Sequence, residues 1–380
     1  SSAASDVYKR QAYVTMFPQL IAGPIVRFQS VQAELKHREI TWEKTGEGAA
    51  RFVCGLCKKV LIADSLAPLV SALQNISETA AKTEAVVTTG IRAEGAGIGT
   101  LGYWVLALAF MLQLYYDFSG YSDMAIGLGK ILGFTFPENF RYPFISKSIS
   151  EFWRRWHITL GTWMKDYVFY PFSLSKAMNK LGKFFKKHSK TRFGKYMAKA
   201  LPICLADLLI FFIVGVWHGA AWKYIVYGMY NGIIMSFSSI MAPVYEKMFK
   251  ITHINKTARW YRGWQIIRTF ILVNISWYFD NAATLTDAFR LMGNTFKHAS
   301  FSMDAVVKMF GSQLDLIILL AGCLVWLIIS ILKEKGIVIR EALDRKPLII
   351  RWAVYIALVM SVAMLGYISN TSGGFMYAQF

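Results

Sequence analysis

Cysteine is scarce in this 380-residue chain, which contains only Cys54, Cys57, Cys204 and Cys323. Cys54 and Cys57 have the C-x-x-C spacing of many zinc sites, but no second pair or nearby histidine completes a ligand set. All four lie in or beside apolar stretches, which is typical of inert packing residues. No metal site is therefore predicted. The chain also lacks a glycine-rich phosphate loop, so no residue can be assigned to cofactor binding.

Acidic residues are few as well: 23 Asp and Glu stand against 42 Lys and Arg, a formal net charge of +19. Such basicity can indicate nucleic-acid binding. Here, however, the positive charges lie in short loops beside apolar runs, as the positive-inside rule expects of cytoplasmic segments in membrane proteins. The charge pattern therefore favours membrane topology and argues against a nucleic-acid partner.

Long apolar runs are what the chain has in abundance. Hydrophobic residues make up 55% of it, with 12 tryptophans and 27 phenylalanines, and the mean hydropathy is +0.38. From residue 98 to the end, apolar runs recur at close to the length of about 20 residues that crosses a bilayer. We predict an all-α fold: a polytopic transmembrane helical bundle with broken or re-entrant segments and interfacial amphipathic helices.

Residues 1–11 are polar and show no periodicity, so they are interpreted as a leader or a fragment boundary. No cleavable signal peptide is visible and the chain has no initiator methionine, so upstream helices are expected to be missing. Residues 12–380 are predicted to form one membrane domain. At its start, Pro18, Gly23 and Pro24 favour a broken segment over residues 12–27.

Basic stretches set the predicted topology. Residues 173–200 carry nine Lys or Arg and no acid, so they are predicted to form a solvated cytoplasmic loop, with contact to anionic lipid as a second interpretation. Because His157 precedes this loop and His218 follows an outward crossing, we expect the two histidines to approach the membrane core from opposite sides. Residues 74–97 are expected to form an external loop. Spans are predicted over 49–73, 98–116, 202–217, 221–241, 265–279, 314–332 and 348–368.

A polar stretch follows the predicted span at 98–116. Its members Tyr116, Asp117, Ser119 and Asp123 could line a polar cavity. The alternative is interfacial capping, because tyrosine favours the headgroup belt while serine and aspartate favour helix N-caps. Both interpretations remain open, and the two prolines in 136–144 predict an ordered turn after this region.

Two histidines lie at polar breaks among the apolar stretches. His157 lies within 148–172, which we predict as an amphipathic helix at the membrane interface. His218 lies between Trp217 and Gly219, at the junction of two long apolar runs. An imidazole at membrane depth is costly unless it is used, although a packed histidine with a satisfied hydrogen bond is the alternative.

Several motifs give the chain a recognisable pattern: FPQLIAGPI at 17–25, YDFSGYSDMAIG at 116–127, FPENFRYPF at 136–144, EFWRRWHITL at 151–160, VWHG at 216–219 and FMYAQF at 375–380. Together they resemble the membrane-bound O-acyltransferase family, in the bacterial branch that O-acetylates alginate and peptidoglycan. By this resemblance His218 matches the catalytic histidine and His157 the second active-site histidine. Family members carry further N-terminal helices. The branch usually has an arginine within the segment matching 277–281, and we assign no function there.

The resemblance implies that an acetyl group moves from cytoplasmic acetyl-CoA toward hydroxyls of an extracytoplasmic polysaccharide, directly or through a partner acetyltransferase outside the membrane. Acetyl-CoA would be a substrate, and no bound cofactor is expected. A neutral imidazole suits general-base catalysis, so His218 would deprotonate the acceptor and His157 would orient the donor. Trp217 and the polar stretch at 116–123 are candidates for lining the cavity. The protein is expected in the bacterial cytoplasmic (inner) membrane, multi-pass and in contact with lipid.

Two other functions remain open. D-alanyl transfer to teichoic acid from a carrier protein belongs to another branch of the superfamily, although the motifs at 136–144 and 375–380 look more like the acetylating branch. A transporter or channel is compatible with broken segments at 17–27 and 117–143. Its expected internal duplication is not found between the halves of the chain.

Overall fold

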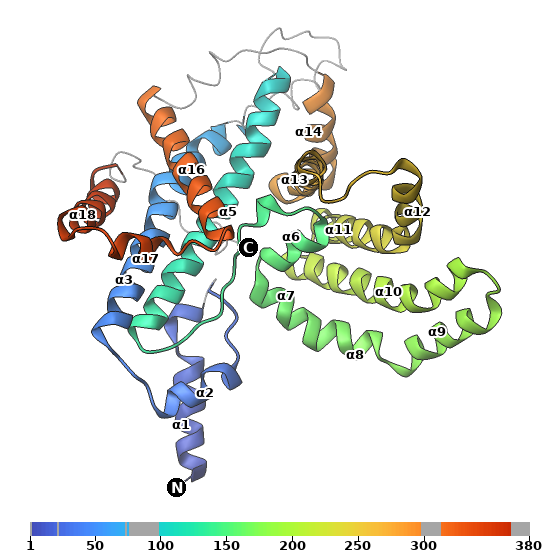
Figure 1. Ribbon diagram of the computed structural model, residues 1–380, viewed down its shortest axis with the longest axis horizontal. Helices are drawn as coiled ribbons and strands as arrows, with labels where there is room; N and C mark the ends of the chain where they lie inside the picture. Colours follow the sequence, from blue (N-terminus) through green and yellow to red (C-terminus); the bar gives the residue numbers. More distant parts are fainter. Residues whose placement is uncertain (1, 21–22, 73, 76–98, 298–312, 366–380) are drawn as a thin grey trace. The chain divides into compact units, whose positions relative to one another are not determined.

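The computed structural model describes residues 2–20, 23–72, 74–75, 99–297 and 313–365, and every regular element within these ranges is a helix (Figure 1). The all-α prediction is therefore confirmed for this part of the chain. The helices form two compact units: unit 1 comprises Ser1–Asn139 with Leu291–Phe380, and unit 2 comprises Phe140–Arg290. Most of the external loop predicted at 74–97 and the motif at 375–380 lie outside the described residues.

Unit 1 is built on two neighbouring helices, α3 and α5, which lie side by side (Figure 1). A helical segment with π-type turns continues α3 over Lys58–Ala63. The helices of this unit are α1 (Ser2–Val14), α2 (Phe28–Lys36), α3 (Trp42–Cys57), α5 (Gly99–Ile131), α16 (Gln313–Glu334), α17 (Ile339–Asp344) and α18 (Leu348–Leu365). Helix α14 (Leu285–Lys297) crosses the boundary between the units.

The N-terminal region of unit 1 differs from its sequence interpretation in one respect. Residues 2–14 form helix α1, although they show no apolar periodicity, because Ala, Lys, Arg and Gln favour a helix without a buried face. The broken segment predicted over 12–27 is confirmed, since α1 ends at Val14 and only a 3-10 turn at Phe17–Gln19 follows in the described part.

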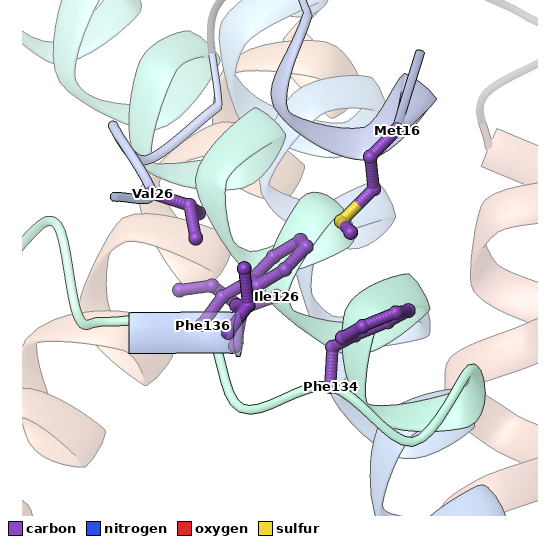
Figure 2. Packing of buried hydrophobic residues seen from close by; sticks show 6 residues of the cluster. Met16, Val26, Ile126, Phe134 and Phe136 are labelled. Carbon is purple, nitrogen blue, oxygen red and sulfur yellow. The ribbon is translucent and has the colours of Figure 1, made fainter. Parts of the chain in front are cut away.

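Unit 1 contains a buried apolar cluster of six residues. Met16 and Val26 from the broken segment pack with Ile126 of α5 and with Phe134 and Phe136 beyond it, as Figure 2 shows; Val31 of α2 is the remaining member. The rings of Phe134 and Phe136 stack with centroids 6.2 Å apart. Burial of these side chains fixes the irregular backbone on both sides of α5.

Helix α5 corrects two sequence interpretations. It runs without interruption over 33 residues, Gly99–Ile131, so the broken segment expected at 117–143 is helical as far as residue 131. The polar residues of 117–123 lie inside the helix and not at its N-terminus, which excludes the capping interpretation. The helix can continue through them because their carboxylates form ion pairs with α3 and the π-type segment that follows it.

Unit 2 is an assembly of short and long helices. Its elements are a 3-10 turn at Pro143–Ile145, α6 (Ile149–Arg155), α7 (Ile158–Met164), a π-helical segment Lys165–Phe169, α8 (Tyr170–Ser173), α9 (Lys176–His188), α10 (Arg192–His218), α11 (Trp222–Ile240), α12 (Ala242–Thr252) and α13 (Arg259–Asn281). The prediction of one amphipathic helix over 148–172 is wrong, because the chain breaks at His157 and continues as separate helical pieces.

The lysine-rich segment at 173–200 is also not a loop. Ser175 caps α9 by accepting a hydrogen bond from the Met178 N–H, and Thr191 caps α10 in the same way. Leu181 and Phe185 are half-buried while the lysines are exposed, so an apolar face packs α9 on α10. The charge of this segment alone suggested a loop. Its helix caps and the spacing of its apolar residues produce a helical hairpin instead.

One of the described helices, α10, is by itself long and apolar enough to cross a membrane. Helices α11 and α12 meet this condition only as a pair, bent by 56°. The remaining spans of the predicted polytopic bundle stay predictions. Within unit 2, α10 and α11 pack closely because a Cβ added at Gly228 would overlap the carbonyl oxygen of Phe211. This close approach sets α11 beside the end of α10.

Candidate active site

The fold of unit 2 brings His157 and His218 together. From His157 the chain leads away through α7 and α8, turns at α9 and returns through α10 to His218 (Figure 1). Helix α10 has 27 residues, roughly 40 Å at 1.5 Å per residue. The lysine-rich hairpin therefore lies at one end of α10 and both histidines at the other. That the two histidines approach the membrane core from opposite sides stays a prediction.

His157 is held in an unusual backbone conformation. It lies between α6 and α7 with φ 44° and ψ 54°, in the left-handed region, which costs a residue with a side chain about 1–2 kcal/mol. Its side chain is only 7% exposed. Burial, and next the neighbouring His218, lower the pKa of His157 to about 3. A strained, buried and neutral imidazole is typical of a functional position.

His218 is the last residue of α10, and its surroundings are aromatic. Gly219 follows with φ 153°, and a Cβ added there would lie 2.7 Å from Cε2 of Tyr224. The glycine therefore lets the Tyr224 ring stack on His218, with centroids 6.0 Å apart. Trp217, which the sequence placed near the site, has its ring 6.2 Å from that of His157. His218 itself is half-buried and can be reached from outside.

A chain of rings connects the surroundings of the two histidines. The Tyr227 ring lies 5.2 Å from His218 and stacks on Trp277 at 5.8 Å. Trp277 in turn lies 5.2 Å from Trp156, the residue before His157. Sequence reasoning missed both Tyr227 and Trp277. The spacing of Tyr224 and Tyr227 on one helix face could have indicated the first, whereas only the fold brings Trp277 of α13 to this place.

A half-buried lysine, Lys223, connects helices of the same region. Lys223 donates from Nζ to the carbonyl oxygens of Ala282 at 2.7 Å and Asp280 at 3.4 Å, joining the start of α11 to the end of α13. The ammonium lies 4.5 Å from the centre of the Tyr224 ring, a cation–π distance. Lys223 therefore holds α13, and with it Trp277, against the aromatic surroundings of His218.

The polar stretch at 116–123 lies in unit 1, and its carboxylates have charged partners. Lys59 Nζ lies 2.6 Å from Asp117 Oδ1. Lys58 Nζ lies 2.6 Å from Asp123 Oδ2, while Arg51 Nη2 lies 2.9 Å from Asp123 Oδ1. These pairs join α5 to α3 and its continuation. Tyr116 and Ser119 are buried on the same helix. A cavity-lining role for the four residues stays a prediction.

Comparison with known proteins identifies the family of the chain. A family model described as MBOAT, membrane-bound O-acyltransferase family, matches residues 6–186, a range that includes His157. The chain belongs to the membrane-bound O-acyltransferase family. This is the family that the motifs at 17–160 and 216–219 resemble.

The relatives to which the chain is similar are named for O-acetylation and for D-alanyl transfer. The chain is 36% identical over 314 residues to a probable alginate O-acetylase AlgI of Azotobacter vinelandii, covering 83% of this chain and 53% of that protein. It is 31% identical to a peptidoglycan O-acetyltransferase of Helicobacter pylori, over 74% of this chain and 45% of that protein. A teichoic acid D-alanyltransferase of Bacillus subtilis is 29% identical to the chain, over 70% of this chain and 59% of that protein. The chain spans about half the length of the curated relatives it matches.

Proposed function

We propose that this chain is part of a membrane O-acyltransferase that moves an acetyl group from acetyl-CoA toward hydroxyls of an exported polysaccharide. The observation that carries the proposal is the meeting of His157 and His218 at one end of unit 2, within a cluster of aromatic rings. The relatives named for alginate and peptidoglycan O-acetylation support acetyl as the acyl group and a polysaccharide as the acceptor.

In the proposed reaction the half-buried His218 is the general base. Its neutral imidazole takes the proton of the acceptor hydroxyl as the oxygen bonds to the thioester carbonyl carbon. The carbon–sulfur bond then breaks, and the CoA thiolate leaves with the electron pair. His157 stays neutral because its pKa is lowered, so it can orient the donor through a hydrogen bond without adding positive charge.

The proposed setting is the bacterial cytoplasmic membrane, which the protein would cross several times in contact with lipid. Acetyl-CoA would enter from the cytoplasm. The polysaccharide would accept the acetyl group outside, either directly or through a partner acetyltransferase. Support comes from the apolar helix α10 and from the relatives named for O-acetylation of alginate and peptidoglycan.

D-alanyl transfer is the less supported candidate, because the D-alanyltransferase relative is less similar and matches less of this chain than the alginate relatives do. The two functions differ in the acyl donor. Purified full-length protein in lipid nanodiscs would be given a polysaccharide acceptor together with either acetyl-CoA or a D-alanyl carrier protein. The release of free thiol from each donor would then be measured.

We expect acceptor-dependent release of CoA from acetyl-CoA and no consumption of the D-alanyl carrier. His218→Ala should lower the rate of this release at least about 100-fold, which is the usual contribution of a general base to a reaction rate. Consumption of only the D-alanyl carrier would replace the proposal with its alternative. A correctly inserted His218→Ala protein with wild-type release would remove His218 from the reaction.

A further inference from the structure

Trp277 carries a buried polar atom that the described residues leave without a partner. Its side chain is 2% exposed, and no acceptor among the described residues lies within hydrogen-bonding distance of its indole N–H. Buried tryptophans usually hydrogen-bond through this group. Lys223 holds the end of α13 in place through backbone carbonyls, so the ring is fixed while its donor stays available.

The rings around Trp277 indicate what this donor serves. The Trp277 ring stacks on Tyr227 with centroids 5.8 Å apart, and Tyr227 lies 5.2 Å from His218. On its other side Trp277 lies 5.2 Å from Trp156, which precedes His157 in the chain. The Trp277 ring therefore lies among rings that belong to the surroundings of both histidines.

We propose that the indole N–H of Trp277 donates a hydrogen bond to the carbonyl oxygen of the acyl group. This inference rests on the proposed function and deepens it. When the acceptor oxygen bonds to the carbonyl carbon, the electron pair of the C=O π bond moves onto that oxygen, and the N–H stabilises the negative charge. Collapse restores the C=O bond and expels the thiolate. Trp277 gives up no proton, because the acceptor's proton has gone to His218.

Trp153 provides a matched comparison. Its indole nitrogen is also buried without a partner among the described residues, and its ring packs on Tyr227 at 6.5 Å. Its remaining ring contacts are with Phe152 at 5.3 Å and Phe211 at 5.4 Å. The same chemical change can therefore be made at two rings that contact Tyr227, one of which, Trp277, also contacts Trp156.

The test measures acetyl transfer from acetyl-CoA by the full-length protein. Trp277→Phe should lower kcat about 100-fold with little change in KM for acetyl-CoA, the signature of an interaction made mainly in the transition state. Benzothienylalanine at position 277, which keeps the ring shape but lacks the N–H, should show the same loss. Trp153→Phe should stay within about 3-fold of the wild type, because a surrounding aromatic ring contributes packing only.

Wild-type rates in the benzothienylalanine protein would overturn the inference, because shape alone would then suffice. Equal losses at positions 153 and 277 would overturn it too, since the effect would belong to packing around Tyr227. Failure of the proposed function is recognised separately: the wild-type protein itself would then transfer no acetyl group, and the assignment of Trp277 would be withdrawn with it.

Discussion

Units 1 and 2 each bury an aspartate, but the two carboxylates have different surroundings. In unit 1 the buried carboxylate of Asp117 faces Lys59, which also pairs with Asp64 at 2.7 Å. In unit 2 the carboxylate oxygen Oδ1 of Asp280 and the indole nitrogen of Trp277 are buried without hydrogen-bond partners among the described residues. The carboxylate of Asp117 is matched with charge, whereas unit 2 keeps an unused donor, the Trp277 indole N–H, in the chain of rings near the two histidines. Buried atoms without a partner among the described residues also occur in unit 1, at Gln113 and Ser119.

This difference separates a structural role from a chemical one. Paired charges between α3 and α5 specify how two helices meet, because either charge alone would be costly to bury. An unsatisfied group beside a strained histidine costs stability, and a ligand that supplies the missing hydrogen bond would recover it. Under the proposed function the paired charges of unit 1 are structural, and the reaction belongs to unit 2, which holds both histidines.

The largest effect on the scaffold should come from Asp117→Ala. It leaves the ammonium of Lys59 buried with only Asp64 to balance it, and breaking a buried pair costs about 3–5 kcal/mol. Thermal unfolding in detergent would measure the loss. Glu138→Gln is the matched control: the Glu138 side chain is 48% exposed and pairs with Arg51, so its loss should cost at most about 1 kcal/mol. Equal effects of the two changes would contradict a structural role for the buried pair.

A smaller effect is expected from Gly219→Ala in unit 2. The φ of 153° and the ring of Tyr224, 2.7 Å from an added Cβ, should together cost about 1–3 kcal/mol. The displaced Tyr224 would no longer stack on His218, so acetyl transfer should fall more than stability does. Activity and unfolding temperature would be measured on the same preparation.

Gly263→Ala is the control for that change. Gly263 lies in helix α13, and nothing lies within 4 Å of an added Cβ. Alanine there should leave activity unchanged and stabilise the helix by up to about 1 kcal/mol. Full activity in Gly219→Ala would show that stacking on His218 does not matter for transfer.

The sequence predicted the helical class, the broken N-terminal segment and the two histidines as a pair. Local motifs carried this information: the histidines lie at breaks in apolar runs, and Pro18 and Pro24 interrupt a helix wherever they occur. It could not predict that residues 173–200 fold as a hairpin, because a dense run of lysines looks the same in a loop and on one face of a helix.

Long-range packing explains the remaining differences. Asp117 and Asp123 looked like a cavity or a cap because their partners lie more than fifty residues earlier, on α3 and its continuation. Trp277 carried no local signal at all. Its position beside Trp156 and Tyr227 depends on α13 packing against α6 and α11, which no pattern within residues 277–281 reveals.

The central claim is that His157 and His218 serve one acyl-transfer site, and a double-mutant cycle tests it most directly. His157→Gln, His218→Ala and the double variant would be compared in acetyl transfer by the full-length protein. If the histidines act as a unit, each single change should cost about 100-fold or more, and the double variant should be no slower than His218→Ala alone. Losses that multiply in the double variant would contradict a shared site.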